Sequence, residues 1–339
     1  GSFPVITTIA QTITSDNINE VYPTYYPPRK SPKECYEQII ADLTDAEKYA
    51  PDNDNSDRTK MTKTVAQAML AKVYAEKEVQ DYDKVITYAD KVIKTTGVEL
   101  EDSYETLWGY DETTKDCLKR NTKEGILEVH WTTGGGNWET WMYGRQLDNW
   151  DYYFTWAKWI TPSRDIINDF EKEGDEIRKN QAIVYYACTW SNYYPASNYP
   201  FMYKLRSSYS NIYWIRLADI ILMKAEAEAY KGNLDESAKL VNQIRKRAKL
   251  KELTSDKTNS KEAMIEAVLH ERRLELAFEG ERWFDLCRNN KVEKYLNGID
   301  NRDKGRIKQV KLFDSNSYLL PIPQTALDQN TNLVQNPGY

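Results

Sequence analysis

A dense group of aromatic residues marks the part of this sequence best suited to binding. Residues 131–160 contain six of the ten tryptophans of the 339-residue chain, interleaved with tyrosines and separated by Gly, Asn, Asp and Arg. A ring with an apolar face and a polar tip can stack on a sugar or a peptide group. The residues that we predict to contact such a ligand are Trp138, Trp141, Tyr143, Arg145, Trp150, Tyr152, Tyr153 and Trp156.

The same rings could instead pack this segment onto the rest of the molecule. Trp131, at the end of an alternating stretch, and Trp159, just before a Thr-Pro pair, are the two rings that we expect in a core. The hydroxyls of a sugar would need polar neighbours, which Arg145, Asn149 and Asp151 could supply. We therefore expect some of the rings to be core and a subset to form a stacking surface.

A second group of residues suggests acid–base chemistry. Glu271, Glu275 and Glu279 are spaced four apart and lie among several arginines. A glycosidase needs two carboxylates that face each other across a substrate and differ in pKa. Carboxylates on one helix face beside arginines are better explained as a structural ion-pair ladder. Asp219 and Glu226 lie in a strongly apolar stretch, where burial would require partners from another helical hairpin.

Other chemistry-bearing motifs are scarce. His130 and His270 are the only histidines, and we expect both to be structural. The four cysteines are widely spaced without a CxxC pair, and no phosphate-binding loop or calcium loop is present, so we predict no cofactor and no metal. The net charge of −6 argues against broad nucleic-acid binding. No apolar run approaches the roughly 18 residues of a membrane-spanning helix.

Helical periodicity predicts the frame that positions these residues. Ser31 and Glu34 predict a capping box at the start of the first helix, with Pro32 in its first turn, and Asn259 is predicted to cap the last helix. The helices that the apolar spacing predicts cover residues 31–49, 61–78, 81–95, 215–248 as a two-helix hairpin, and 259–279. The two hairpins resemble tetratricopeptide repeats.

Residues 97–214, which we call the excursion, differ from the hairpins that flank them. They contain glycine runs, the aromatic window, an alternating stretch that predicts a strand at 126–131, a predicted helix at 163–173 and a ring-rich loop at 192–204. Long irregular segments inside a compact domain are often functional. The predicted fold class is mainly α: tetratricopeptide-like helical hairpins with a long irregular aromatic-rich excursion and little β.

Three motifs in the second half resemble the SusD/RagB family of nutrient-binding lipoproteins from Bacteroidetes. The first is YWIRLADIILMKAEAEAYKGN, followed by NQIRKRA. The second is HERRLELAFEGERWFDLCR, and the third is the ending YLLPIPQTALDQNTNLVQNPGY. The opening GSFPVITT resembles a point inside the family, after a lipidated cysteine and a first helical region that we expect to precede it.

This resemblance implies a single SusD-like domain over 1–339, the C-terminal portion of the family. Its parts would be a hairpin region at 31–96, the ligand-binding excursion at 97–214, a second hairpin region at 215–290 and an extended segment at 291–339. It further implies a lipoprotein on the surface of the outer membrane that binds a glycan without catalysis. A SusC-like TonB-dependent transporter would be its partner in polysaccharide utilisation, and a lipid anchor, not present in this sequence, would tie it to the membrane.

Three alternatives remain open at the level of sequence. The same fold could bind peptides, because Tyr and Trp suit peptide groups as well as sugars. A helical glycosidase or polysaccharide lyase would combine hairpins with an aromatic cleft, but would require opposed acids or a basic group beside the rings. A tetratricopeptide scaffold would bind a protein tail in its helical groove, and its activity would not depend on the aromatic window.

Overall fold

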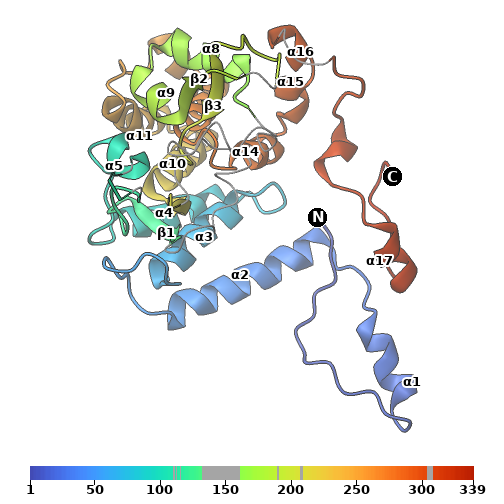
Figure 1. Ribbon diagram of the computed structural model, residues 1–339. Helices are drawn as coiled ribbons and strands as arrows, with labels where there is room; N and C mark the ends of the chain where they lie inside the picture. Colours follow the sequence, from blue (N-terminus) through green and yellow to red (C-terminus); the bar gives the residue numbers. More distant parts are fainter. Residues whose placement is uncertain are drawn as a thin grey trace.

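Short-range sequence signals produce a body of helices, shown in the computed structural model of Figure 1. The structure describes residues 1–109, 111, 113–114, 116–131, 161–188, 191–206, 209–303 and 308–339. The helices and helical turns of its first half are α1 (Ile18–Val21), η1 (Tyr22–Tyr25), α2 (Pro32–Tyr49), α3 (Lys63–Ala75), α4 (Tyr82–Ile93), α5 (Tyr104–Trp108), α8 (Arg164–Glu173) and α9 (Glu176–Ala182). Those of its second half are α10 (Leu217–Lys231), α11 (Leu234–Arg247), α12 (Ser255–Thr258), α13 (Lys261–Glu275), α14 (Arg282–Arg288), α15 (Val292–Leu296), α16 (Ile299–Arg302), η2 (Ser315–Tyr318) and α17 (Gln324–Gln329). The strands are β1 (Gly125–Val129), β2 (Ile183–Tyr186), β3 (Tyr199–Met202) and β4 (Ile212–Arg216).

Helix α2 begins where its capping residues predict. The Ser31 hydroxyl accepts a hydrogen bond from the backbone N–H of Glu34 at 3.3 Å, and the Glu34 carboxylate accepts one from the backbone N–H of Ser31 at 2.9 Å. Pro32 occupies the first turn, where a missing N–H leaves no bond unmade. The capping box predicted from the sequence is confirmed.

Helix α10 is the centre of the main core. It packs against α3, α4, α11 and α13, and Ile220, Leu222 and Ala225 on it are completely inaccessible to solvent. A helix that is buried on most of its sides is stable only when other helices surround it. The two predicted hairpins, α3–α4 and α10–α11, are therefore joined through α10 into one body (Figure 1).

Helix α13 differs from its prediction at both ends. Its N-cap is Ser260, whose hydroxyl accepts a hydrogen bond from the backbone N–H of Ala263 at 3.2 Å. The predicted cap Asn259 is wrong, because that residue has helical dihedrals and ends α12. The helix stops at Glu275 rather than 279, since Phe278 and Gly280 have φ of 66° and 87°, in the left-handed region that ends a right-handed helix.

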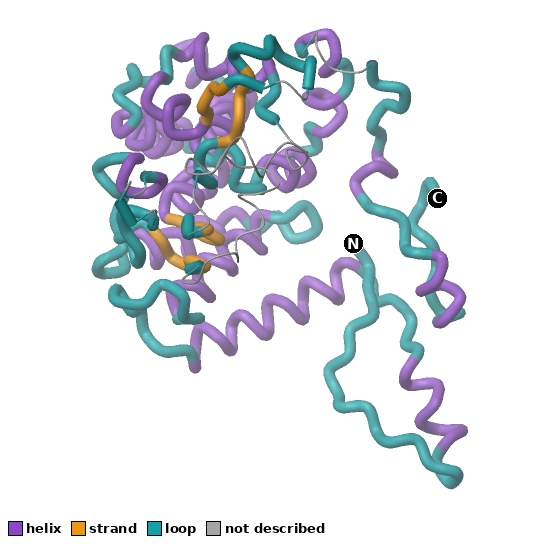
Figure 2. The backbone as a smooth tube through the Cα atoms, viewed as in Figure 1, coloured by secondary structure: helices purple, strands orange, loops and turns teal. Residues whose placement is uncertain are grey.

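Two small antiparallel sheets complete the described part of the excursion (Figure 2). Strand β1, which confirms the strand predicted at 126–131, pairs with β4, and β4 continues directly into α10. Strand β2 pairs with β3, so the predicted loop at 192–204 contains a strand that the sequence analysis missed. Pro200 sits inside β3 without an N–H to donate, which is tolerated because both strands of a two-stranded sheet are edges.

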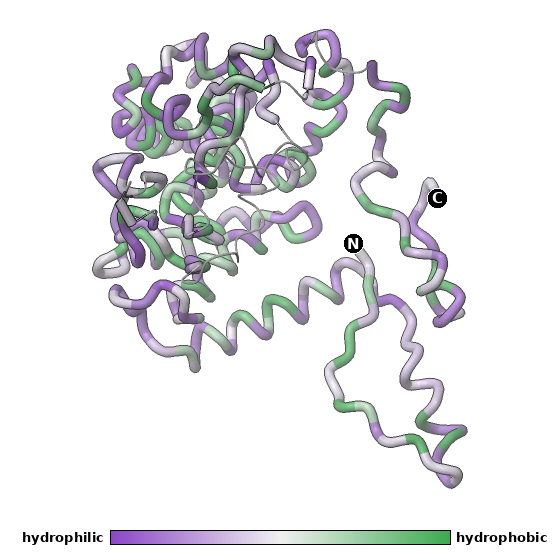
Figure 3. The backbone as a smooth tube through the Cα atoms, viewed as in Figure 1, coloured by the Kyte–Doolittle hydropathy of each residue, from purple (hydrophilic) through white to green (hydrophobic). Residues whose placement is uncertain are grey.

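The two terminal segments lie beside each other and extend from the helical body (Figure 1). Arg29 joins them, because its guanidinium donates hydrogen bonds to the carbonyl of Val334 and to the side chain of Asn336, both at 2.6 Å. Parts of the N-terminal loop are green in Figure 3, which marks apolar residues, and Ile9 on this loop is 96% exposed. Within the described ranges, the helices are all too short or too polar to cross a membrane.

Candidate functional site

The carboxylates of α13 form a buried ion-pair network with residues from other elements. Glu275 accepts hydrogen bonds from Arg216 at 2.6 Å and from Arg247 at 2.5 Å. Glu271 accepts one from Arg178 at 2.6 Å. The predicted structural pairing is confirmed, but the predicted ladder along one helix is wrong. The guanidiniums come instead from β4, α11 and α9, and so tie these elements to α13.

The electrostatics of this network suit structure rather than catalysis. Burial alone would raise the pKa of Glu275, but the surrounding guanidiniums, Arg247 foremost, hold that pKa well below its ordinary value. A general acid needs a raised pKa and access to substrate. Glu275 and Glu271 are at most 1% exposed, so neither carboxylate is accessible to a substrate, and the pKa of Glu275 is lowered rather than raised.

Carboxylates on α10 are paired in the same way. Asp219 accepts a hydrogen bond from Arg272 at 2.7 Å, and Glu226 accepts two from Arg288, both at 2.7 Å. Asp219 also pairs with Lys72 on α3 at 2.6 Å, which confirms the predicted pairing between hairpins for this residue. The partner of Glu226 comes instead from α14, outside both hairpins. Among the described residues, no group of three or more His, Cys, Asp or Glu side chains is arranged to hold a metal ion.

Each histidine lies beside a carboxylate. His130 Nε2 is 2.7 Å from Glu128, whose carboxylate also accepts a hydrogen bond from the backbone N–H of Thr122 at 2.9 Å. His270 Nε2 is 3.1 Å from Glu173 on α8. These contacts join neighbouring segments of the chain, in agreement with a structural role.

The predicted binding residues lie outside the described residues. Trp138, Trp141, Tyr143, Arg145, Trp150, Tyr152, Tyr153 and Trp156 all fall within 132–160, as does Trp159. Trp131, predicted to be core, is half-buried and lies two residues after the end of β1. The assignment of these eight residues to a ligand therefore stays a prediction.

A described part of the excursion does present aromatic rings at the surface. Tyr193 and Tyr194 lie edge to face with ring centroids 5.0 Å apart, next to Arg164 at the start of α8. The guanidinium carbon of Arg164 is 4.5 Å from one ring centroid and 4.1 Å from the other. With Ser191, Asn192, Pro195 and Ala196, these three residues line an open hollow of about 800 Å³, which we call the tyrosine surface.

Hydrogen bonds hold the tyrosine surface in place from below. Asp303 accepts a hydrogen bond from the Tyr193 hydroxyl at 2.5 Å and another from Arg164 at 2.9 Å. The Tyr194 hydroxyl donates to the carbonyl of Pro162 at 2.7 Å. Burial alone would raise the pKa of Asp303, but the hydrogen bonds from Tyr193 and Arg164 outweigh it and lower that pKa. Both rings are thus fixed before any ligand arrives, which reduces the entropy lost on binding.

Sequence reasoning missed two features of this region. Arg164 and Asp303 are 139 positions apart, so nothing local could pair them. Trp214 on β4 is 68% exposed, whereas its neighbours Tyr213 and Ile215 are buried. The alternation of a strand places successive side chains on opposite faces, and this signal in IYWIR could have identified Trp214 as an exposed ring.

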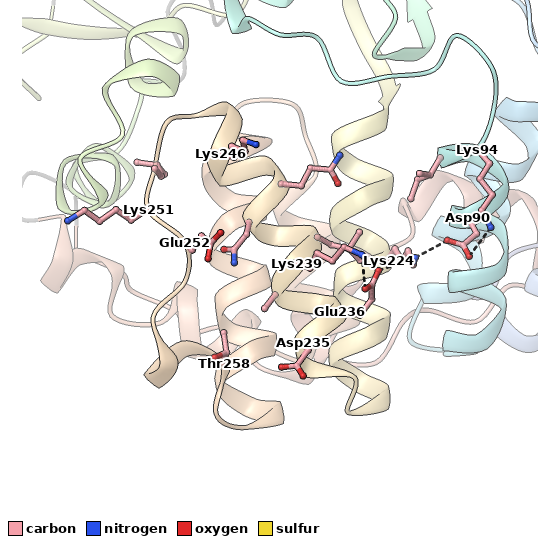
Figure 4. Close-up of a pocket in the computed structure, with 16 residues that line it drawn as sticks. Asp90, Lys94, Lys224, Asp235, Glu236, Lys239, Lys246, Lys251, Glu252 and Thr258 are labelled. Carbon is pink, nitrogen blue, oxygen red and sulfur yellow. Dashed lines mark hydrogen bonds and ion pairs between the residues drawn. The ribbon is translucent and has the colours of Figure 1, made fainter.

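A larger groove lies on the helical hairpins, away from the excursion in sequence (Figure 4). It has a volume of about 1010 Å³ and runs between α4, α10, α11 and residues 250–252. Its charged residues alternate in sign, as in the pairs that Lys224 makes with Asp90 at 2.8 Å and Lys239 makes with Glu236 at 3.3 Å. Since no aromatic residue is among those that line it in the described structure, this groove does not offer a stacking surface for sugar rings.

Two helical hairpins packed around α10 form a mainly helical frame, and the excursion adds an aromatic surface to it. The chain belongs to the SusD family, whose sequence model matches residues 36–339. The family resemblance inferred from the three motifs is therefore confirmed, and so is the mainly helical fold class.

Individual relatives support the same assignment. The crystal structure of a SusD superfamily protein from Parabacteroides distasonis matches with a TM-score of 0.75 and 25% identity, covering 100% of this chain and 74% of that one. A putative sugar binding protein from Bacteroides vulgatus matches with a TM-score of 0.68 and 25% identity, covering 93% of this chain and 67% of that one. The SusD-like protein P2 of Formosa agariphila is 27% identical over an alignment 344 residues long, which covers 91% of this chain. The chain spans 66% of the length of that curated relative.

Proposed function

We propose that this protein captures an oligosaccharide at the surface of the outer membrane and passes it to a TonB-dependent transporter without cleaving it. Membership of the SusD family supports a role in binding. The relative from Bacteroides vulgatus that is described as a putative sugar binding protein supports a carbohydrate as the ligand.

The observation that carries this proposal is the tyrosine surface. Tyr193 and Tyr194 offer ring faces and edges at an open hollow, and Arg164 adds a charged donor beside them. Sugar rings present apolar C–H faces to aromatic planes and hydroxyls to polar groups. The hollow is large enough for a ligand of several rings, since small-molecule sites measure roughly 300–1,000 Å³.

The proposed ligand face also includes the aromatic window of the sequence. The window belongs to the same excursion as Tyr193 and Tyr194, and its polar residues suit the same kind of ligand. We propose that the glycan contacts both, and that the predicted residues of the window add stacking to that of the tyrosine surface.

The hairpin groove of Figure 4 is proposed as the docking face for a SusC-like transporter. Its mixed charges, among them exposed Lys239 and Glu236, suit a polar protein–protein contact better than a sugar ring. In this arrangement ligand and transporter occupy different surfaces, and a lipid anchor holds the complex to the membrane.

The experiment is a calorimetric titration of the protein with plant, host and microbial glycans and with a peptide pool. Tyr193→Ala removes one ring of the tyrosine surface, and Tyr49→Ala removes an exposed ring at the end of α2 as a matched control. Loss of one stacked ring weakens binding by about 1 kcal/mol, about fivefold. We expect this loss for a glycan with Tyr193→Ala and no change with Tyr49→Ala.

Other outcomes separate the alternatives. If only peptides bind, the cargo is a peptide and not a glycan. Appearance of shorter products during incubation with a glycan would show an enzyme. The same titration with alanine at Trp138, Trp141, Trp150 and Trp156 in turn tests the aromatic window: four unaffected variants would show that these rings do not contact the ligand.

A further inference from the structure

A smaller, more apolar pocket is lined in part by the segment that precedes α8. It has a volume of about 380 Å³ and is formed between α8 and the turn that joins α13 to α14. Its walls include Thr161, Ile166, Leu276, Phe278, Arg282 and Trp283. The volume falls within the roughly 300–1,000 Å³ of small-molecule sites.

Arg282 in this pocket differs from the arginines next to it. Arg272 and Arg273 each pair with two aspartates. Arg282 donates one hydrogen bond, from Nη1 to the carbonyl of Leu269 at 2.9 Å, and its guanidinium carbon is 4.8 Å from the centroid of the Tyr295 ring. No carboxylate of a described residue lies within ion-pair distance of it. Burial foremost, and then the charge of Arg273, lowers the pKa of Arg282 to about 10.

The turn that carries the pocket holds a strained backbone. Phe278 has a φ of 66°, a left-handed conformation that a bulky residue rarely adopts. Phe278 lines the pocket and packs against the apolar cluster that includes Ile166 and Phe170 of α8. Strain of this kind persists only where the surrounding structure enforces it, and it is concentrated at binding and catalytic sites.

The pocket and the tyrosine surface share one short segment. Thr161 and Ser163 line the pocket, whereas Arg164 lines the tyrosine surface and Pro162 accepts the Tyr194 hydroxyl. The two hollows are therefore lined by adjacent residues of one segment.

We propose that this pocket binds the carboxylate of an acidic sugar residue, with Arg282 pairing with the carboxylate while Trp283 and Phe278 cover the sugar ring. A planar guanidinium forms two parallel hydrogen bonds to a carboxylate, and its Nε and Nη2 donate to no described residue. The apolar walls strengthen this pairing by excluding water. The inference rests on the proposed glycan function and assigns to it a ligand class, uronate-containing oligosaccharides.

The test compares oligogalacturonides and alginate oligomers with their methyl esters, which keep the sugar backbone but remove the charge. The variants are Arg282→Gln and Arg282→Lys, with Arg302→Gln as the matched control. Arg302 is a nearby arginine that is partly exposed and already pairs with Asp165 at 3.3 Å. We expect the unmodified protein and Arg302→Gln to bind an acid at least about tenfold tighter than its ester. Arg282→Gln should bind both equally, and Arg282→Lys should keep part of the preference.

Each outcome separates this inference from the proposed function. If neutral and esterified glycans bind as tightly as the acids, the acidic-sugar pocket is wrong and glycan capture still stands. The same holds if a preference for the acids survives in Arg282→Gln. Binding of no glycan of either kind would overturn both. If peptides bind through their C-terminal carboxylate, this binding depends on Arg282 and no uronate binds, the acidic-sugar ligand is wrong and the ligand is a peptide. Thermal unfolding of each variant confirms that it is folded, and Arg282→Lys keeps the charge if Arg282→Gln fails to fold.

Discussion

The buried network around α13 and the tyrosine surface are built from the same residue types. In the network, Tyr104 donates its hydroxyl to Glu275, and Arg247 packs over the Tyr104 ring with its guanidinium carbon 4.4 Å from the centroid. At the tyrosine surface, Tyr193 donates to Asp303 and Arg164 packs over the Tyr193 ring in the same manner. Tyrosine, arginine and carboxylate form the same small motif in both places.

Burial separates the two regions. Tyr104 is 3% exposed, and its ring is covered by protein, so the network can bind no further partner. Tyr193 keeps part of its ring at an open hollow, while its carboxylate partner Asp303 is buried. The same Arg–Tyr–carboxylate motif is therefore fully enclosed in the network, whereas at the tyrosine surface it leaves part of the ring accessible to the ligand that we propose.

The substitution with the largest expected effect is Glu275→Gln, which tests the buried network. This change keeps the shape of the side chain but removes the charge shared by Arg216, Arg247 and Arg178. Removing one partner of a buried ion pair costs about 3–5 kcal/mol. We expect a loss of this size in the free energy of unfolding measured with urea.

Glu37→Gln is the matched control for that change. Glu37 is an exposed member of a pair with Lys33 at 3.9 Å, so its loss should leave the free energy of unfolding unchanged. Equal effects of the two substitutions would show that burial is not what distinguishes the network from the surface.

Asp303→Asn tests the tyrosine surface, and its expected effect is smaller than that of Glu275→Gln. The substitution weakens the hydrogen bonds that fix Arg164 and Tyr193, and bonds to a charged group contribute about 1.5–3 kcal/mol. Glycan affinity should also fall in Asp303→Asn, because both residues lose the support that orients them. A variant that loses stability but keeps full affinity would show that the tyrosine surface does not need this support.

The pH dependence of the same variant has a definite sign. The pKa of Asp303 is lowered in the folded protein, so its contribution is present above the ordinary aspartate pKa of about 3.9 and is lost as the pH falls through the folded value. The difference in free energy of unfolding between the unmodified protein and Asp303→Asn should be constant from about pH 5 to pH 8 and shrink below about pH 4. A difference that instead grows on acidification would contradict the lowered pKa.

Local signals made much of the helical frame predictable. Ser31 with Glu34 marked the start of α2, and Ser163 caps α8 where a helix was expected, because a cap acts on residues only three positions away. Asn259 was the wrong cap since an equally suitable Ser260 follows it. The choice between two adjacent caps depends on the path of the chain from α12, which neighbouring residues alone do not determine.

The excursion was much less predictable. Its prediction rested on aromatic density, which located the excursion but not the contacts made within it. Arg164 meets Asp303 across 139 positions, and Arg247 meets Glu124 across 123, so tertiary structure alone brings these charges together. Composition indicates that charged and aromatic residues need partners, whereas the fold decides which of them remain accessible to a ligand.

The smallest expected effect belongs to Lys239→Ala in the hairpin groove of Figure 4. Lys239 pairs with Glu236 at 3.3 Å, but its side chain is 77% exposed. Exposed pairs contribute little because water and salt screen the charges, so the free energy of unfolding should change by less than about 0.5 kcal/mol. Glycan affinity should not change at all, because the groove is separate from the tyrosine surface. A measurable loss of glycan affinity in calorimetry would instead show that the two surfaces bind one ligand together, and would remove the distinction between a ligand face and a docking face.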